Sequence, residues 1–195
     1  MNLSKMSRYV SLLGCALALG LVAGCATTSK PQQPVGPASP EWVMKGSGAF
    51  KDANGISVLY GVGASQGTKM VPLARSEAGL SADAEIAKVV NNYVSALVKS
   101  YMASTTAGDM SKSSEEKHVS NTMKSFAQAC LHGVQKIDNW KDPADGTWYT
   151  LAKLDMTGIK KALEESKELD AKVRDYVRAN AEKAFDELAS EEAKH

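Results

Sequence analysis

Cysteine and aromatic residues are scarce in this chain, and neither sign of charge is in excess. Its 195 residues include 3 Cys and 6% aromatic residues, and 23 Lys+Arg against 22 Asp+Glu give a formal net charge of +1. Three cysteines cannot form the disulfide framework of a small secreted domain. A chain this close to neutral lacks the basic field that holds nucleic acid, so we expect no nucleic-acid partner. The core must be largely aliphatic, because few aromatic residues are present to fill it.

Metal-ligand and catalytic spacings are also missing from the sequence. The three histidines, His118, His132 and His195, do not have the spacing of a metal site. Cys130 lies two residues before His132, but it belongs to an apolar helical stripe, and no acid is placed to orient the histidine. We therefore interpret Cys130 as a small buried hydrophobe, and we predict a protein that is not an enzyme and holds no metal or cofactor.

The longest hydrophobic run lies near the N-terminus. Residues 9–23 are almost wholly apolar and follow Lys5 and Arg8. This run is shorter than the roughly 20 residues of a spanning helix, and it is typical of the hydrophobic region of a signal peptide. It ends in the sequence Leu21-Val22-Ala23-Gly24-Cys25. An ordinary secretory signal with an incidental cysteine, or a simple membrane anchor, is the alternative interpretation.

The small residues before Cys25 resemble the lipobox of bacterial lipoproteins. The resemblance implies cleavage of the signal peptide, residues 1–24, and acylation of Cys25 on its sulfur and its new amine. Three acyl chains would hold the protein on a membrane far more firmly than a single myristoyl chain does. Ala26 stands where an aspartate would favour the inner membrane, so resemblance to lipoprotein sorting in two-membrane bacteria implies the outer membrane. We expect the domain to face the periplasm.

Residues 25–40 are predicted to form a tether. Proline recurs at every third position, at Pro31, Pro34, Pro37 and Pro40, which favours polyproline II and leaves almost nothing to bury. At about 3.1 Å per residue, such a segment spans roughly 45 Å. It would let the folded domain stand away from the lipid surface.

Residues 41–156 begin with the pattern of a β-hairpin. Asn54-Gly55 between short apolar runs predicts a tight turn in which both residues take positive φ. Apolar residues then alternate over residues 56–63, as in a half-buried strand. Two interpretations of Gly61 and Gly63 are open: they allow the close approach of a helix, or they belong to a phosphate-binding loop. The first is favoured, because the spacing is not G-x-G-x-x-G.

Helical periodicity predicts two helices after this strand, over residues 72–102 and 113–130. In the first of them Ala74, Ala78 and Ala82 recur at i+4 and would let the helix approach the glycine-rich strand. Strand, helices and a second hairpin together predict an α+β fold. We expect an antiparallel sheet of three or four strands with the two helices on one face.

Residues 134–156 predict the second hairpin, around a turn at residues 142–146. Asp138, Asp142 and Asp145 do not have the spacing of a calcium loop, so we interpret them as turn residues.

Three aromatic residues on this second hairpin, Trp140, Trp148 and Tyr149, are the candidate ligand or partner surface. Exposed rings flanking a cleft would stack on a sugar, whereas buried rings would be part of the core.

Residues 157–195 predict a long C-terminal helix with a narrow apolar stripe and i,i+4 pairs such as Asp170–Arg174. One small sheet does not need so long a helix. We therefore expect the half after Asp175 to contact the domain weakly and to mediate self-association or contact with other envelope proteins. Its stripe residues are Val177, Ala181, Phe185 and Leu188.

The ordered set of motifs resembles the LPP-twenty family of bacterial outer-membrane lipoproteins. The motifs are the lipobox, the tether, Pro40-Glu41-Trp42, Tyr60-Gly61-Val62-Gly63-Ala64, Ala84-Glu85-Ile86-Ala87, Trp140, and Trp148-Tyr149-Thr150-Leu151-Ala152-Lys153-Leu154. The resemblance covers roughly residues 40–156. Asp83 and Ala84 stand where the family usually carries an arginine, and the C-terminal helix lies outside the match.

The lipobox, the tether and the lack of any acid–base, metal or nucleotide pattern predict a non-enzymatic lipoprotein that acts through protein contacts in the cell envelope. The resemblance offers no catalytic residues, and a related module of a flagellar assembly protein implies a role in flagellar or envelope assembly. A small-ligand or peptidoglycan-binding envelope module is the alternative.

Overall fold

The computed structural model describes residues 38–105 and 113–194. The expected signal peptide, Cys25 and the tether up to residue 37 lie outside the described residues. The elements, in chain order, are α1 (Glu41–Lys45), β1 (Gly48–Lys51), β2 (Ser57–Ser65), α2 (Val71–Thr105), α3 (Ser113–Leu131), β3 (Gln135–Lys141), β4 (Trp148–Asp155), α4 (Met156–Glu165) and α5 (Ala171–Glu192).

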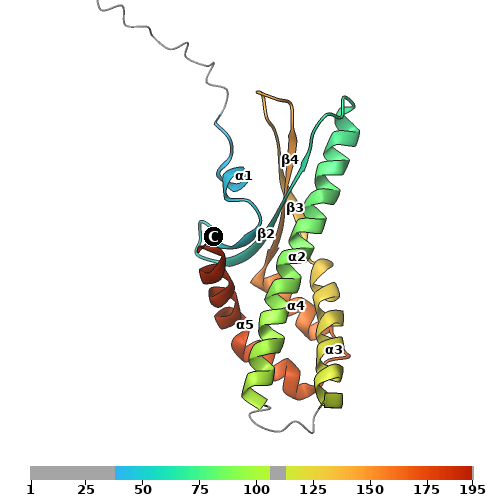
Figure 1. Cartoon of the computed structure of the whole chain (residues 1–195), viewed down its shortest axis with the longest axis vertical. Coiled ribbons are helices and arrows are strands. Elements are labelled where there is room, and N and C mark those ends of the chain that lie inside the picture. The colour runs from blue at the N-terminus through green and yellow to red at the C-terminus, as the bar shows by residue number, and fades with distance from the viewer. Residues whose placement is uncertain (1–37, 106–112, 195) are drawn as a thin grey trace, which may run out of the picture. The chain divides into compact units, whose positions relative to one another are not determined.

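The predicted α+β fold is confirmed. β1, β2, β4 and β3 form, in that order, a four-stranded sheet in which every neighbouring pair is antiparallel. Both hairpins and both central helices occur where the sequence predicts them, with boundaries that differ by a few residues. Figure 1 shows α2 crossing the sheet and continuing beyond it to the region where α3, α4 and α5 gather.

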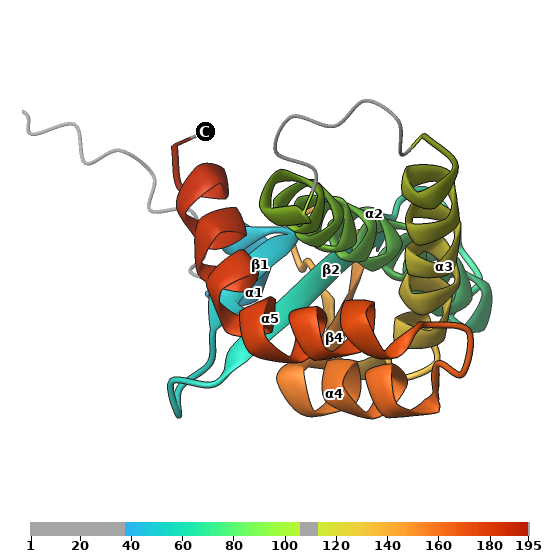
Figure 2. The same ribbon diagram turned by 90° about the horizontal axis from the view of Figure 1, so that it is seen from below.

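The two faces of the sheet are covered differently, because successive side chains of a strand alternate between them. Leu59 faces α2 together with its partner Leu154 of β4 and with Ala152, the partner of Gly61, and these residues belong to the main core with residues of α2, α3, α4 and α5. We call this the inner face (Figure 2). The short α1 contacts β4 from the outer face, where the indole Nε1 of Trp42 donates to Asp138 at 2.9 Å.

The contact between β2 and α2 requires glycine. A Cβ built on Gly61 would lie 2.4 Å from the backbone nitrogen of Ile86, and one on Gly63 would lie 2.0 Å from that of Ala82. Ala74, Ala78 and Ala82 are fully buried along the same side of α2. The predicted close approach of the helix to the glycine-rich strand is confirmed, and it leaves no room for a phosphate against these glycines.

The first hairpin forms as predicted, but its turn is of another kind. Lys51 pairs with Ser57, so five residues, 52–56, connect the strands. Only Gly55 takes positive φ there, at 75°, and Asn54 does not. Asp52 organises the turn, because its Oδ1 accepts from the backbone N–H groups of Asn54 and Ile56 at 2.9 and 3.0 Å. These bonds lower the pKa of Asp52, with a further contribution from Lys153.

The single C-terminal helix that the sequence predicts is in fact two helices. α4 ends at Glu165, where the hydroxyl of Ser166 donates to the carbonyl of Ala162 at 2.7 Å. α5 begins after Asp170, whose carboxylate accepts from the N–H of Val173 at 2.8 Å. The expected Asp170–Arg174 pair does not form, because the Arg174 guanidinium donates to the carbonyls of Ser166 and Leu169 instead.

The expectation that the second half of this segment packs weakly is wrong. Its stripe lies in the main core, with Phe185 fully buried and the others almost so: Val177, Ala181 and Leu188. The helix is needed because α2 extends past the sheet and must be covered there; the Tyr93 hydroxyl of α2 donates to the carbonyl of Ala181 at 3.1 Å. α5 also covers the edge of the sheet, since Glu192 accepts from the N–H of Ala49 at 2.6 Å.

Gly63→Ala tests the contact between strand and helix. The added methyl group would overlap the backbone of α2, which cannot move without displacing the helix, so we expect a loss of about 3 kcal/mol or more in the free energy of unfolding. Urea denaturation followed by circular dichroism measures it.

Gly79→Ala is the matched control, because Gly79 is a buried glycine of α2 whose added Cβ would meet only the flexible end of Lys136, at 3.2 Å. Alanine is the better helix former by about 1 kcal/mol, so this variant should be neutral or more stable. Equal effects of the two substitutions would contradict the role given to Gly63.

Phe185→Ala tests whether α5 belongs to the core. Removing a fully buried phenyl ring should cost about 3–5 kcal/mol, whereas Lys172→Ala on the exposed side of the same helix should cost little. Truncation after Asp175 should accordingly unfold the domain. A truncated chain that keeps its thermal transition would show that α5 is dispensable.

Candidate functional site

Two of the three candidate aromatic residues lie together on the outer face of the sheet. Trp140 pairs with Tyr149 across β3 and β4, and their ring centroids are 5.6 Å apart with a 36° angle between planes. Both residues are half-buried. The two rings therefore cover one another at the outer surface of the hairpin and do not stand on opposite walls of a cleft.

The third ring, Trp148, lies on the opposite face. It pairs with Ser65 and Lys141, one position along from Tyr149, so its side chain turns to the side of α2. The Arg75 guanidinium lies 5.4 Å from its ring centroid, and the Lys141 ammonium lies 5.9 Å from it. Trp148 is thus a half-buried indole with two cations within 6 Å of its ring centroid, and it lies on the opposite face of the sheet from the Trp140–Tyr149 pair.

Cys130 lies in the core, as the sequence predicts. Its side chain is fully buried on α3, and burial raises the pKa of the thiol to about 12. α3 ends at Leu131, and His132 is exposed in the turn that follows, with the N–H of Gly133 bonded to the carbonyl of Cys130. A thiol with so high a pKa is protonated at neutral pH and cannot act as a nucleophile.

The aspartates of the second hairpin shape its turn. Asp142 accepts from the N–H of Ala144, and Asp145 accepts from that of Thr147, each at 2.8 Å. The bonds from Thr147 lower the pKa of Asp145. Over residues 38–105 and 113–194, no group of three or more His, Cys, Asp or Glu side chains is arranged to hold a metal ion.

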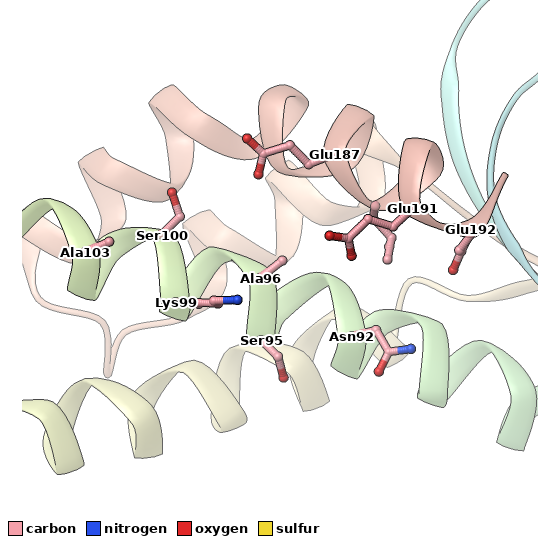
Figure 3. A pocket seen from close by; sticks show the side chains of 10 residues that line it. Asn92, Ser95, Ala96, Lys99, Ser100, Ala103, Glu187, Glu191 and Glu192 are labelled. Carbon is pink, nitrogen blue, oxygen red and sulfur yellow. The ribbon is translucent and has the colours of Figure 1, made fainter. Parts of the chain in front are cut away.

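A groove of about 630 Å³ runs between α2 and α5 (Figure 3). α2 contributes Lys99 and small or polar side chains, whereas α5 contributes three carboxylates, of which Glu191 points toward α2. Glu192 is engaged with the edge of β1, so Glu187 and Glu191 are the acidic groups that a ligand would meet. The lining residues are Asn92, Ser95, Ala96, Lys99, Ser100, Ala103, Glu187, Leu188, Glu191 and Glu192.

Sequence reasoning missed this groove. Asn92, Ser95 and Lys99 fall on the polar half of the predicted helix, which indicates only a solvated surface. The groove exists because the chain turns at residues 166–170 and brings α5 back beside α2, with the hydroxyls of Ser100 and Tyr176 2.7 Å apart. The sequence does contain a signal for this arrangement. Asp170 is a favourable N-cap residue, and it indicates that a second helix begins there after a break.

A search of protein-family models and of curated proteins finds no match to this chain. Within the part of the chain that the structure describes, no helix is long and apolar enough to cross a membrane.

The reactivity of Cys130 tests its burial. In a chain with Cys15→Ser and Cys25→Ser, so that Cys130 is the only thiol, a thiol-specific reagent at about pH 7.5 should label the folded protein far more slowly than the urea-unfolded protein. The folded thiolate forms only near pH 12, whereas an unfolded cysteine titrates near about pH 8.5. Equal labelling rates would show that the site is open.

Proposed function

We propose that this protein is a lipid-anchored lipoprotein of the outer membrane that acts through protein contacts in the cell envelope and not as an enzyme. The observation that carries the proposal is the sequence Leu21-Val22-Ala23-Gly24-Cys25 behind a short apolar run and a basic N-terminus. Acylated Cys25 would then be the point of contact with the membrane, and the domain would face the periplasm.

The position of the first described element supports this division of the chain. α1 begins at Glu41, directly after the proline-rich segment, and Trp42 attaches it to Asp138 of β3. The expected tether therefore joins a residue that is held on the outer face of the sheet.

The resemblance to the LPP-twenty family gives further support, because its motifs fall on elements that contact one another. Tyr60-Gly61-Val62-Gly63-Ala64 lies in β2, the segment from Trp148 to Leu154 lies in the adjacent β4, and Ala84-Glu85-Ile86-Ala87 lies in α2 against Gly61. A motif set that forms one packed unit is what a shared fold would produce.

We also propose that α5 contacts other envelope proteins or a second copy of the chain, but through a different side of the helix from the apolar stripe. The apolar stripe is occupied inside the domain, so a partner would meet the exposed, charged side of α5. Glu187 and Glu191 of the groove lie on that side.

The alternative function, binding of a small ligand or of peptidoglycan, is favoured by the groove between α2 and α5. Its volume falls in the range of small-molecule sites, about 300–1,000 Å³. The aromatic hairpin supports it less, because Trp140 and Tyr149 cover each other and Trp148 lies on the other face.

Cys25→Ser tests the anchor. Loss of the acylated sulfur should move the protein from the membrane fraction to the soluble periplasmic fraction of a two-membrane host, measured by fractionation and immunoblotting. Unchanged membrane association would refute the anchor.

Ala26→Asp is the control variant, because it leaves Cys25 in place and changes only the residue expected to direct sorting. It should keep the protein on membranes and shift it from the outer to the inner membrane in a density gradient. Release of this variant into the soluble fraction would show that the assay reports damage and not acylation.

A further inference from the structure

Exposed apolar side chains gather at one end of the molecule. Of the seven large hydrophobic side chains exposed among the described residues, four lie within residues 70–80. Their exposed fractions are 66% for Met70, 44% for Val71, 47% for Leu73 and 66% for Leu80. We call these four residues the α2 apolar patch.

The patch adjoins the turn of the second hairpin. Gln66, in the β2–α2 connection, donates to Asp145 of that turn at 3.2 Å, and Figure 1 shows the connection and the turn at the same end of the molecule. Leu73 and Leu80 are seven residues apart, which is two helical turns and about 10 Å, so they lie on the same side of α2. The patch is therefore an apolar tip that continues along one side of the helix.

Charged groups around the patch balance one another. Lys69, Arg75 and Lys141 are exposed there, and Trp148 lies between the last two. The three carboxylates at this end are turned to groups of the protein itself: Glu77 accepts from the hydroxyls of Ser65 and Thr68 at 2.6 and 2.7 Å, and Asp142 and Asp145 accept from turn N–H groups.

Exposed apolar side chains with long basic side chains at the same end of a helix are typical of a surface that lies at a lipid–water interface, because the apolar groups and the aliphatic stems enter the headgroup region while the charges stay in water. The chain between Cys25 and Ala38 limits how far the domain can lie from a membrane anchor at Cys25. Ala38 lies 13 residues after Cys25, a distance that would be at most about 40 Å in a polyproline II segment at about 3.1 Å per residue, so an anchor at Cys25 would keep the patch within reach of the bilayer.

We propose that the α2 apolar patch docks on the surface of the phospholipid bilayer in which the chain is anchored. The proposal rests on the proposed function for the supply of the anchor, but not for the docking itself. The three cations equal the three carboxylates in number, so docking needs no anionic lipid and depends weakly on salt. It would lay the first turns of α2 against the headgroups and orient the domain relative to the membrane.

The test places an environment-sensitive fluorophore on Leu73→Cys. The mature chain, residues 25–195 with Cys25→Ser, is held on phosphatidylcholine vesicles by an N-terminal His tag and a nickel-chelating lipid, so acylation plays no part. Cys130 is buried and does not compete for the label. We expect a blue shift of the emission and quenching by lipids that carry a spin label in the upper acyl chain, in low and in high salt.

Ala53→Cys is the matched control, because residue 53 is also exposed but lies in the β1–β2 turn at the other end of β2. It should show neither the shift nor the quenching. Adding Met70→Asp and Leu80→Asp to the Leu73→Cys chain should abolish both signals without releasing the tagged protein from the vesicles.

Identical spectra from residues 53 and 73 on vesicles would overturn the docking proposal. A shift at residue 73 that appears without vesicles and grows with protein concentration would overturn it in favour of a second copy of the chain. A shift seen in native membranes and absent from vesicles would overturn it in favour of a protein partner. Failure of the lipid anchor would appear separately, as an acylation-competent chain that does not fractionate with membranes.

Discussion

The direct contact between the backbones of β2 and α2 sets the position of everything else in this domain. Gly61 and Gly63 have no side chain to hold the helix away, and Ala78 and Ala82 supply the smallest helical surface opposite them. A sheet and a helix usually keep a layer of side chains between them. Here that layer is reduced almost to nothing, so the direction of α2 across the sheet is determined by two glycines.

A helix of 35 residues placed in this way must project beyond a sheet whose longest strand has 9 residues. The projecting half carries a wide apolar side, with Val90, Tyr93 and Leu97 almost fully buried, and the sheet cannot cover it. α3, α4 and α5 cover it instead, and α5 in addition closes the β1 edge against pairing with another strand. The length of α2 thus explains why a C-terminal segment that the sheet does not need is nevertheless part of the core.

Except for α1 and the division of the C-terminal segment into α4 and α5, element type and order could be predicted from the sequence, because period, glycine placement and turn residues act locally. The close approach at Gly61 and Gly63 could be predicted because glycine has few other reasons to alternate within a strand. The role of Phe185, the break at residues 166–170 and the groove could not. Each depends on how far α2 projects beyond the sheet and on which element packs against it there. An apolar helical stripe has the same sequence pattern whether it is buried inside its own chain or binds another protein. The turn at Asn54 was mispredicted because Asp52 offers the backbone a competing set of bonds.

Several carboxylates of the domain accept hydrogen bonds from its own backbone and hydroxyl groups. Asp52, Asp155 and Asp170 accept backbone N–H groups at a turn and two helix starts, Glu192 does so at the β1 edge, and Glu77 holds two hydroxyls. Where such bonds shift a pKa, as at Asp52 and Glu77, they lower it, so these groups are ionised at neutral pH and add stability that is lost as the pH falls. These carboxylates therefore hold the backbone at turns, helix starts and a sheet edge. The features that the described part of the domain presents outward are a groove between two helices and an apolar end.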